Sequence, residues 1–210
     1  MYQQHPSSAL TRVFRERPFQ GVDPNGARFI FLGLDANYSA DIEQQTIFPQ
    51  LLEYHRDGAS FWRKYGVHHP FLLPSYRGDG RRYHVNFARI GLTPAHAADV
   101  SFVELLHVPT VGRSLLARTD FDPAHLKWIG SLLSSGVERD VFLSAGVLRL
   151  LQTVNEFAWI KRSSPCSGPL AVIQSVGGTR LYRHLHFSNY GKFQKQMDAE
   201  AAAIRQIVQG

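Results

Sequence analysis

The sequence predicts an α/β fold: a three-layer α/β/α sandwich around a central, mainly parallel sheet of four to five strands. Short apolar runs rich in β-branched and aromatic residues alternate along the chain with segments of helical periodicity. The chain has 210 residues, of which 44% are hydrophobic and 19% charged, as in an ordinary globular domain. No internal repeat, low-complexity tract or linker divides it, so we expect one domain over residues 1–210.

Five segments have the composition of strands bounded by turn signals. The clearest is residues 28–35, whose apolar run Phe29–Leu32 meets a polar side chain only at its end. The sequence Val176-Gly-Gly-Thr179 separates the last two segments and is typical of a hairpin. The expected strands are residues 28–35, 99–106, 140–145, 170–174 and 181–187.

Capping and stop signals delimit the expected helices, which are residues 7–17, 40–57, 58–65, 122–136, 145–157 and 191–208. Asp122 and Pro123 mark the clearest start, with an N-cap side chain followed by proline at the first helical position. Pro49 is expected to bend or interrupt the second helix, because proline removes a backbone hydrogen bond. Residues 67–97, rich in Pro, Gly and His, are expected to form the longest irregular segment.

Composition limits the classes of function. Lys and Arg outnumber Asp and Glu by 23 to 17, a net charge of +6 that favours polyanionic partners without requiring one. The single cysteine, Cys166, excludes a disulfide framework and a cysteine-ligated zinc or iron–sulfur site. Apolar runs are too short to cross a bilayer and no signal-peptide pattern is present, so we expect a cytoplasmic protein without membrane association.

Polar residues gather after the first and the last expected strands. The first cluster is Gly33-Leu34-Asp35-Ala36-Asn37-Tyr38-Ser39, and the last runs from His184 to Lys192. Ligands of open parallel sheets bind beyond the carboxyl ends of the strands, so both clusters are expected to contribute to one site.

These two clusters make the chain resemble the uracil-DNA glycosylase superfamily, most closely its mismatch-specific uracil/thymine type. Gly33-Leu34-Asp35 stands where that superfamily carries Gly-x-Asp-Pro-Tyr or Gly-x-Asn-Pro-Gly after its first strand. His186-Phe187-Ser188 stands where it carries His-Pro-Ser or Asn-Pro-Ser after its last strand. Ala36 and Phe187 occupy the positions of the two motif prolines. The resemblance implies a cofactor-independent enzyme that excises uracil or a related damaged base by hydrolysis of the N-glycosidic bond.

The resemblance also implies roles for individual residues. Asp35 would stabilise the positively charged sugar or orient a water, and His186 would donate a hydrogen bond to the departing base. The base would leave the DNA stack and lie on Phe48, which follows Asp35 at the spacing of the family's stacking phenylalanine. Further contacts to the base are expected from Gly33, Leu34 and Asn37. Contacts to DNA are expected from Ser39, Ser188, Tyr190, Gly191 and Lys192.

A basic turn in the irregular segment adds candidate DNA contacts. The cations Arg77, Arg81 and Arg82 are interleaved with Tyr76, Tyr83 and His84. This pattern can grip a phosphate backbone and stack bases, although a solvated turn has the same composition. Taken together, we expect a monomer that binds duplex or single-stranded DNA containing a damaged base.

Other interpretations remain open from the sequence. The missing motif prolines suggest a catalytically silent nucleic-acid-binding protein on the same fold. His184 and His186 face the same side of a strand, which suggests a metal-dependent hydrolase of nucleotides or phosphoesters, although no ligand set is completed. Asp35 by itself is more typical of a turn cap than of a catalytic group. Glu104 interrupts an apolar strand, so it either faces the site or marks the end of the strand.

Overall fold

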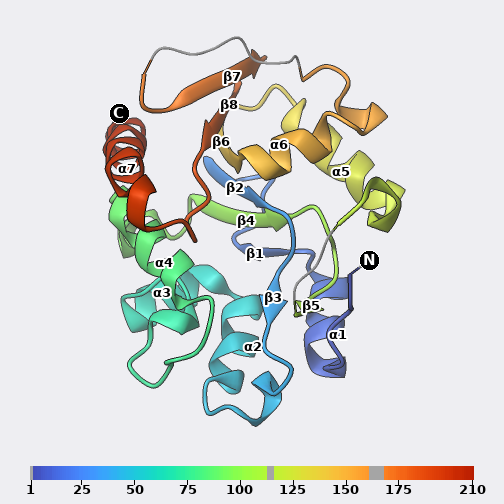
Figure 1. Cartoon of the computed structure of the whole chain (residues 1–210), viewed down its shortest axis with the longest axis vertical. Coiled ribbons are helices and arrows are strands. Elements are labelled where there is room, and N and C mark those ends of the chain that lie inside the picture. Colours follow the sequence, from blue (N-terminus) through green and yellow to red (C-terminus); the bar gives the residue numbers. More distant parts are fainter. Residues whose placement is uncertain (1, 113–115, 161–167) are drawn as a thin grey trace.

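A single mixed sheet forms the centre of the computed structural model, which describes residues 2–112, 116–160 and 168–210 (Figure 1). Cys166 lies outside the described residues. The strands of the sheet are β1 (Phe19–Gly21), β2 (Phe29–Gly33), β4 (Val100–Glu104), β6 (Arg139–Ser144), β7 (Ala171–Val176) and β8 (Thr179–His184). Their order across the sheet is β1-β4-β2-β6-β8-β7. A separate short ladder joins β3 (Asn37–Tyr38) to β5 (Thr110–Val111).

The four central strands run parallel, and the two edge strands run antiparallel to their neighbours. β2 pairs in parallel with β4 and β6, and β6 pairs in parallel with β8. β1 pairs antiparallel with β4, and β7 forms the expected hairpin with β8. The predicted α/β class is confirmed, but the sheet has six strands rather than four to five. The unexpected strand is β1, whose three residues are too few to show a periodic pattern.

Seven α-helices lie in the described part of the chain: α1 (Ser8–Glu16), α2 (Phe48–Arg56), α3 (Gly58–Tyr65), α4 (Arg81–Phe87), α5 (Pro123–Leu133), α6 (Ala145–Leu151) and α7 (Gln194–Gln209). Short 3₁₀ helices occupy Ile42–Gln44, Pro70–Leu72, Ala88–Ile90, Pro94–His96, Arg118–Asp120, Asn155–Phe157 and Gly191–Phe193.

Two expectations about the helices need correction. The helix expected over residues 40–57 begins only at Phe48, because Pro49 occupies its first turn, where the missing N–H of proline is tolerated. The expected helix is therefore interrupted before Pro49 and is not bent by it, and Pro49 lies in the first turn of α2. The segment 67–97, expected to be irregular, contains α4, which is anchored by the fully buried ring of Phe87.

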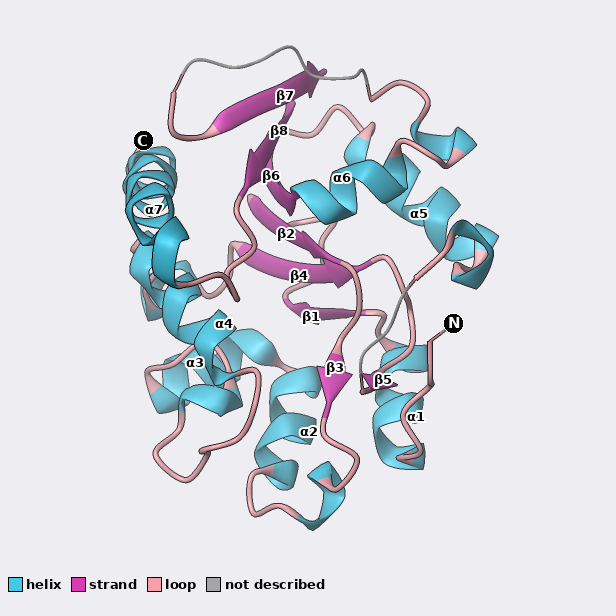
Figure 2. Cartoon of the chain, viewed as in Figure 1, coloured by secondary structure: helices cyan, strands magenta, loops and turns pink. Residues whose placement is uncertain are grey.

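Helices cover both faces of the sheet (Figure 2). Successive side chains of β2 point to opposite faces, as in any strand. Ile30 and Leu32 belong to an apolar cluster with residues of α5 and α6. Phe29 and Phe31 belong to a second cluster with residues of α3, α4 and α7. Because helices pack on both faces of the sheet, polar side chains can gather at the carboxyl ends of its parallel strands. None of the described helices combines the length and the apolar composition needed to span a membrane.

Candidate active site

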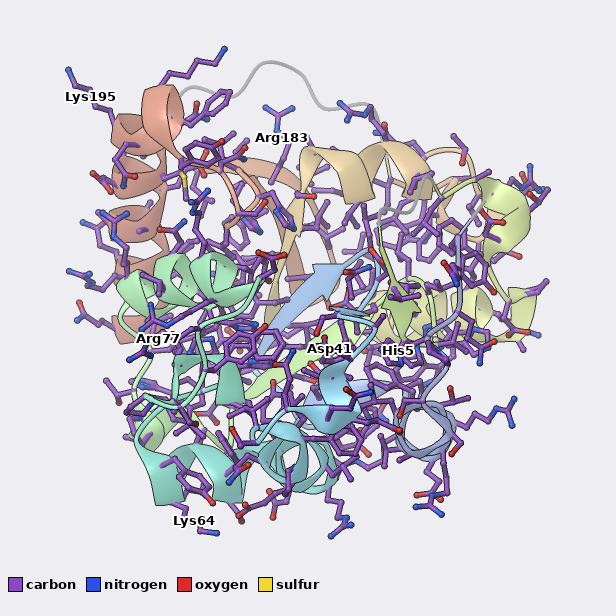
Figure 3. All side chains as sticks on the ribbon, turned by 60° about the horizontal axis from the view of Figure 1, so that its bottom comes forward. His5, Asp41, Lys64, Arg77, Arg183 and Lys195 are labelled. Atoms are coloured by element: carbon purple, nitrogen blue, oxygen red, sulfur yellow. The ribbon has the colours of Figure 1, made fainter. Side chains whose placement is uncertain are left out.

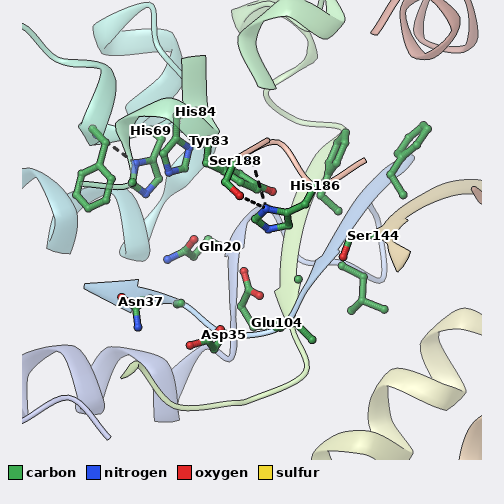
Figure 4. A pocket seen from close by; sticks show the side chains of 18 of the residues that line it. Gln20, Asp35, Asn37, His69, Tyr83, His84, Glu104, Ser144, His186 and Ser188 are labelled. Carbon is green, nitrogen blue, oxygen red and sulfur yellow. Dashed lines mark hydrogen bonds between the residues drawn. The ribbon is translucent and has the colours of Figure 1, made fainter. Parts of the chain in front are cut away.

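A pocket opens where the four parallel strands end (Figure 4). Each strand contributes to its lining, with Gly33 from β2, Glu104 from β4, Ser144 from β6 and His184 from β8. Its volume is about 360 Å³, within the range of sites for small organic molecules. The two polar clusters that follow the first and last parallel strands therefore meet at one place.

Asp35 lines this pocket directly after β2, and Thr110 orients its carboxyl group. The buried hydroxyl of Thr110, at the start of β5, donates to Oδ2 of Asp35 over 2.5 Å. The backbone N–H of Thr110 also donates to the carbonyl of Ala36 over 2.9 Å, which holds the adjacent main chain. Within the described residues Oδ1 of Asp35 accepts no hydrogen bond, so one carboxyl oxygen is available to a ligand.

Asn37 also lines the pocket, but its amide hydrogens are already engaged. Its Nδ2 donates to the hydroxyl of Thr110 over 2.9 Å and to the carbonyl of Gly112 over 2.7 Å. A side-chain amide has two donor hydrogens, and both are used here. Asn37 can therefore offer a ligand only its carbonyl oxygen, which accepts hydrogen bonds.

His186 approaches the pocket from the loop after β8, and Ser188 sets its tautomer (Figure 4). Nδ1 of His186 lies 3.3 Å from the backbone nitrogen of Ser188 and 2.6 Å from its hydroxyl oxygen. Because a backbone N–H can only donate, Nδ1 is the acceptor and the proton is on Nε2. The ring is accessible to solvent, but the surrounding protein partly desolvates it, which lowers the pKa of His186. The negative charge of Asp35 acts in the opposite direction and is the smaller effect. A neutral imidazole with a free Nε2–H donor results.

Phe187 anchors the loop that carries His186. Its ring is buried and packs against the rings of Tyr83 and Phe87, with centroid distances of 5.4 and 5.7 Å. Asn86, on α4, donates to the carbonyl of Phe187 over 2.6 Å and to that of Asn189 over 3.3 Å. The conformation of this loop is thus determined by packing and hydrogen bonds on both sides of His186.

Glu104 places a second carboxyl group in the pocket, next to Asp35. Burial, and secondarily the charge of Asp35, raises the pKa of Glu104 from 4.5 to about 8. Its side chain is therefore mostly protonated at neutral pH. Glu104 is the last residue of β4 and also lines the pocket, so both interpretations that the sequence left open for this residue hold.

The raised pKa of Glu104 predicts an effect of pH on stability. Between pH 4.5 and about 8 the folded chain keeps a proton that the unfolded chain releases, so stability falls as pH rises through this window. Glutamine is neutral in both states. Glu104→Gln is therefore expected to match the wild type at pH 4.5 and to exceed its unfolding free energy above pH 8, by at most about 5 kcal/mol. Denaturant unfolding across this range measures the difference.

The exposed Glu16, on α1, offers a matched control. Glu16→Gln removes a carboxylate that is not buried, so no pH-dependent gain of stability is expected from it. A Glu104→Gln stability difference of equal size at every pH would show that Glu104 is ionised in the folded chain.

The expected DNA contacts lie on the surface. All seven are exposed: Ser39, Arg81, Arg82, Ser188, Tyr190, Gly191 and Lys192. Only Ser188 among them lines the pocket, but Gly80 and Tyr83, which flank the two arginines in sequence, line it as well. The guanidinium group of Arg82 lies 4.2 Å from the ring centroid of Tyr190 and so joins α4 to the loop after β8. The arginines therefore lie at the rim of the pocket.

These basic side chains are free to meet an anionic ligand. Within the described part of the chain, Arg81, Arg82 and Lys192 take part in no salt bridge. Arg77 and Arg183 carry further positive charge outward on the same molecule (Figure 3). Unpaired cations at a pocket rim are suited to phosphate oxygens.

Phe48 does not take the position expected of it. It is the first residue of α2 and packs with Leu52 and Leu73 against the apolar cluster around α1 and α2, outside the lining of the pocket. Phe48 is the first residue of α2, and its ring packs against this apolar cluster. Phe48 therefore supplies no aromatic surface to the pocket.

Several pocket residues come from segments to which the sequence assigned no catalytic role. Gln20 reaches the pocket from β1 and donates to the hydroxyl of Tyr38 over 3.0 Å. His69 and His84 line it with parallel rings, whose centroids are 3.6 Å apart. Burial lowers the pKa of His84 to about 3, so this imidazole is uncharged. Tyr83 lines the pocket beside them. The sequence indicates Tyr83 and His84 only as part of the basic, aromatic turn, and His69 only through the abundance of His in residues 67–97. It gives no signal for Gln20.

Comparison of the sequence with known protein families and with curated proteins gives no match. The chemistry of the chain therefore has to be inferred from its own residues.

The histidines do not assemble a metal site in the described part of the chain. No group of three or more His, Cys, Asp or Glu side chains among those residues is placed to hold a metal ion. His184, 2.5 Å from the carbonyl of Leu185, uses Nδ1 as a donor, and burial lowers its pKa to about 4. It is thus a neutral structural neighbour of the pocket.

Proposed function

We propose that the chain is a DNA glycosylase of the uracil-DNA glycosylase type, built as a three-layer α/β/α sandwich, which excises uracil or a related damaged base. The observation that carries the proposal is that Asp35 and His186, from opposite ends of the chain, line one pocket of about 360 Å³. Breaking an N-glycosidic bond builds positive charge on the sugar and negative charge on the base. A carboxylate and a neutral imidazole donor complement these two charges.

In the proposed reaction the bond between the sugar C1′ and the base nitrogen breaks, and its electron pair leaves with the base. Asp35 stabilises the cationic sugar and orients a water, whose oxygen forms the new bond to C1′ and whose proton passes to Asp35 and then to solvent. His186 donates from Nε2 to the base oxygen on which negative charge develops. The departing base anion takes up a proton from solvent, so the products are a free base and an abasic sugar, and no cofactor is used.

The target base must first leave the DNA stack. We assign the aromatic platform to Tyr83 in place of Phe48, because Tyr83 lines the pocket and its ring centroid lies 5.3 Å from that of His186. Tyr190, with two thirds of its surface exposed (66%), is suited to fill the gap that the base leaves. Arg81, Arg82 and Lys192 would bind the neighbouring phosphates, with Ser39, Ser188 and Gly191 as further contacts.

The anchoring of two loops supports an enzyme over a silent binding protein. Ala36 and Phe187 stand where the glycosylases that the chain resembles have prolines, which stiffen the loops. The buried ring of Phe187 and the two hydrogen bonds from Asn86 restrain one loop. The hydrogen bond from Thr110 to the carbonyl of Ala36 restrains the other. Packing can thus supply the rigidity that proline supplies elsewhere.

A substrate panel tests the proposal. Labelled oligonucleotides carrying uracil opposite guanine, uracil opposite adenine, thymine opposite guanine, hypoxanthine, or uracil in a single strand are incubated with the protein, with and without chelator. Alkali then cleaves the strand wherever a base has been lost. We expect cleavage of at least one uracil substrate, unaffected by chelator and absent from an identical preparation of Asp35→Ala.

The other outcomes of the panel point to different functions. Binding of these oligonucleotides without cleavage would indicate the catalytically silent protein. Cleavage that chelator abolishes would indicate the metal-dependent hydrolase. Cleavage that persists at the wild-type rate in Asp35→Ala would contradict the assigned chemistry.

A further inference from the structure

The N-terminal segment, residues 3–7, lies against β5, beside the start of α1 (Figure 1). Two backbone hydrogen bonds, 3.0 and 2.9 Å long, join the two stretches: from the N–H of Val111 to the carbonyl of Gln3 and from the N–H of His5 to the carbonyl of Pro109. Between these bonds Gln4 and Thr110 form an antiparallel bridge. Thr110 itself donates its N–H to the carbonyl of Ala36, on the side of β3. β5 is therefore held on one edge by β3 and on the other by the N-terminal segment.

The buried imidazole of His5 ties the same segment to the chain that follows β3. Its Nδ1 lies 3.0 Å from the backbone nitrogen of Ser7, and because a backbone N–H can only donate, Nδ1 is the acceptor. The proton is therefore on Nε2, which donates to the carbonyl of Ser39 over 2.9 Å. Ser39 is the residue directly after β3. One side chain thus links the N-terminal segment to the connection that begins with Asp35.

Ser7 adds a further tie to this connection. Its hydroxyl oxygen accepts from the backbone N–H of Leu10 and so caps α1, and the hydroxyl also donates to the carboxylate of Glu43. Glu43 lies in the 3₁₀ helix that follows β3. We call residues 3–7 the clasp, because they hold β5 on one side and the connection after β3 on the other.

The clasp bears on Asp35 because the position of Asp35 depends on Thr110. Among the described residues, the hydroxyl of Thr110 is the one hydrogen-bond donor to the Asp35 carboxyl group. β5 has only two residues and two register pairs with β3, and so small a ladder is weakly stable by itself. The bonds from the clasp therefore help to fix Thr110, and with it the carboxylate, beside the pocket.

We propose that His5 is a positioning residue for Asp35. By bonding to Pro109 and to Ser39, it fixes the separation of β5 from the chain that carries the carboxylate. This inference rests on the proposed function, in which the carboxylate stabilises the cationic sugar. Such stabilisation depends on geometry, and a displacement of about 1 Å can cost about 10²-fold in rate. His5 does not line the pocket, so it acts on the rate of bond breaking and not on DNA binding.

Two substitutions separate the two hydrogen bonds of the imidazole. In His5→Gln the side-chain amide reaches the position of Nε2 and can donate to Ser39, but the acceptor for Ser7 is lost. In His5→Asn the shorter side chain can accept from Ser7, but no donor reaches Ser39. Single-turnover excision of uracil at saturating protein is measured for both. We expect His5→Asn to lower the rate constant by about 10-fold to 100-fold and His5→Gln by less than about 3-fold, with duplex affinity within about 3-fold of the wild type in both.

The route through Asp35 is tested by adding His5→Asn to Asp35→Asn. With the carboxylate already gone there is nothing for His5 to position, so the added substitution is expected to change the residual rate by less than about 3-fold. His96→Ala, at a histidine that does not line the pocket, is the matched control, and it is expected to leave the rate unchanged in both backgrounds.

A spectroscopic readout does not need catalysis. The ¹³C resonance of the Asp35 carboxyl carbon, identified by its loss in Asp35→Asn, depends on the hydrogen bond from Thr110. At fixed pH, His5→Asn is expected to shift this resonance, because Thr110 moves when the clasp loosens. His5→Gln and His96→Ala are expected to leave the resonance in place.

The two proposals fail differently. If the wild type excises uracil but His5→Asn and His5→Gln lower the rate equally, or if His5→Asn has its full effect in the Asp35→Asn background, His5 does not position Asp35 and only this inference is lost. If the wild type excises nothing, yet the Asp35 resonance moves in His5→Asn alone, the positioning stands and the glycosylase chemistry is lost. An unmoved resonance in His5→Asn overturns the positioning whatever the activity.

Discussion

Replacing Asp35 by asparagine is expected to lower the rate of uracil excision by about 10²-fold to 10⁴-fold, the usual contribution of a positioned acid or base. Asparagine has nearly the same shape as aspartate, and its carbonyl oxygen can still accept the hydrogen bond from Thr110. The substitution therefore removes the negative charge while leaving the side chain in place. In the proposed reaction, both stabilisation of the cationic sugar and acceptance of the proton from water depend on that charge.

Single-turnover excision of uracil from a labelled duplex measures this effect, because it isolates the bond-breaking step from product release. Asp41→Asn is a suitable control, since Asp41 is an exposed aspartate in the same connection between β2 and α2. Duplex affinity of Asp35→Asn should stay within a few-fold of the wild type. A rate within about 5-fold of the wild type would show that Asp35 only caps a turn, the structural alternative for this residue.

Replacing His186 by alanine is expected to lower excision by about 10²-fold to 10³-fold, as removal of a single oxyanion donor does in other enzymes. The loss is expected because alanine removes the Nε2–H donor. Ser188 binds Nδ1 of His186 and so keeps the proton on Nε2. Phe187 and Asn86 hold the loop independently of the imidazole, so the fold should be retained.

His186→Gln separates the donor role from a general loss of packing. A glutamine amide can donate where the imidazole did, so this variant should recover part of the activity that alanine loses. His96→Ala, at a histidine that caps a 3₁₀ helix away from the pocket, serves as a control. Equal activity of His186→Ala and the wild type would remove the imidazole from the mechanism.

Much of the fold could be predicted because its signals are local. The apolar run before Asp35 and the capping pair Asp122 and Pro123 mark β2 and α5 without reference to any other part of the chain. The sequence does not predict β1 and α4, because their local patterns of apolar residues are weak. β1 has only three residues, and α4 buries little besides Phe87.

The candidate site was predictable only in part. Asp35 and His186 follow parallel strands, and parallel strands bring their carboxyl ends to one edge, so their meeting follows from topology. Phe48 was assigned from spacing along the chain, which does not determine the direction in which a ring points. Tyr83 belongs to a short helix whose position depends on packing against β2 and the loop after β8.

The amino-acid sequence is enough to predict the α/β class, the main order of strands and helices, and the two strand-end segments that carry an acid and an imidazole. Three features follow only from the folded arrangement: Glu104 faces the pocket beside Gly33, Phe48 packs outside the pocket, and Ser188 leaves the Nε2 hydrogen of His186 free. Periodicity and caps depend on neighbours in sequence. The environment of a side chain depends on atoms contributed by remote segments, and those distances exist only once the chain has folded.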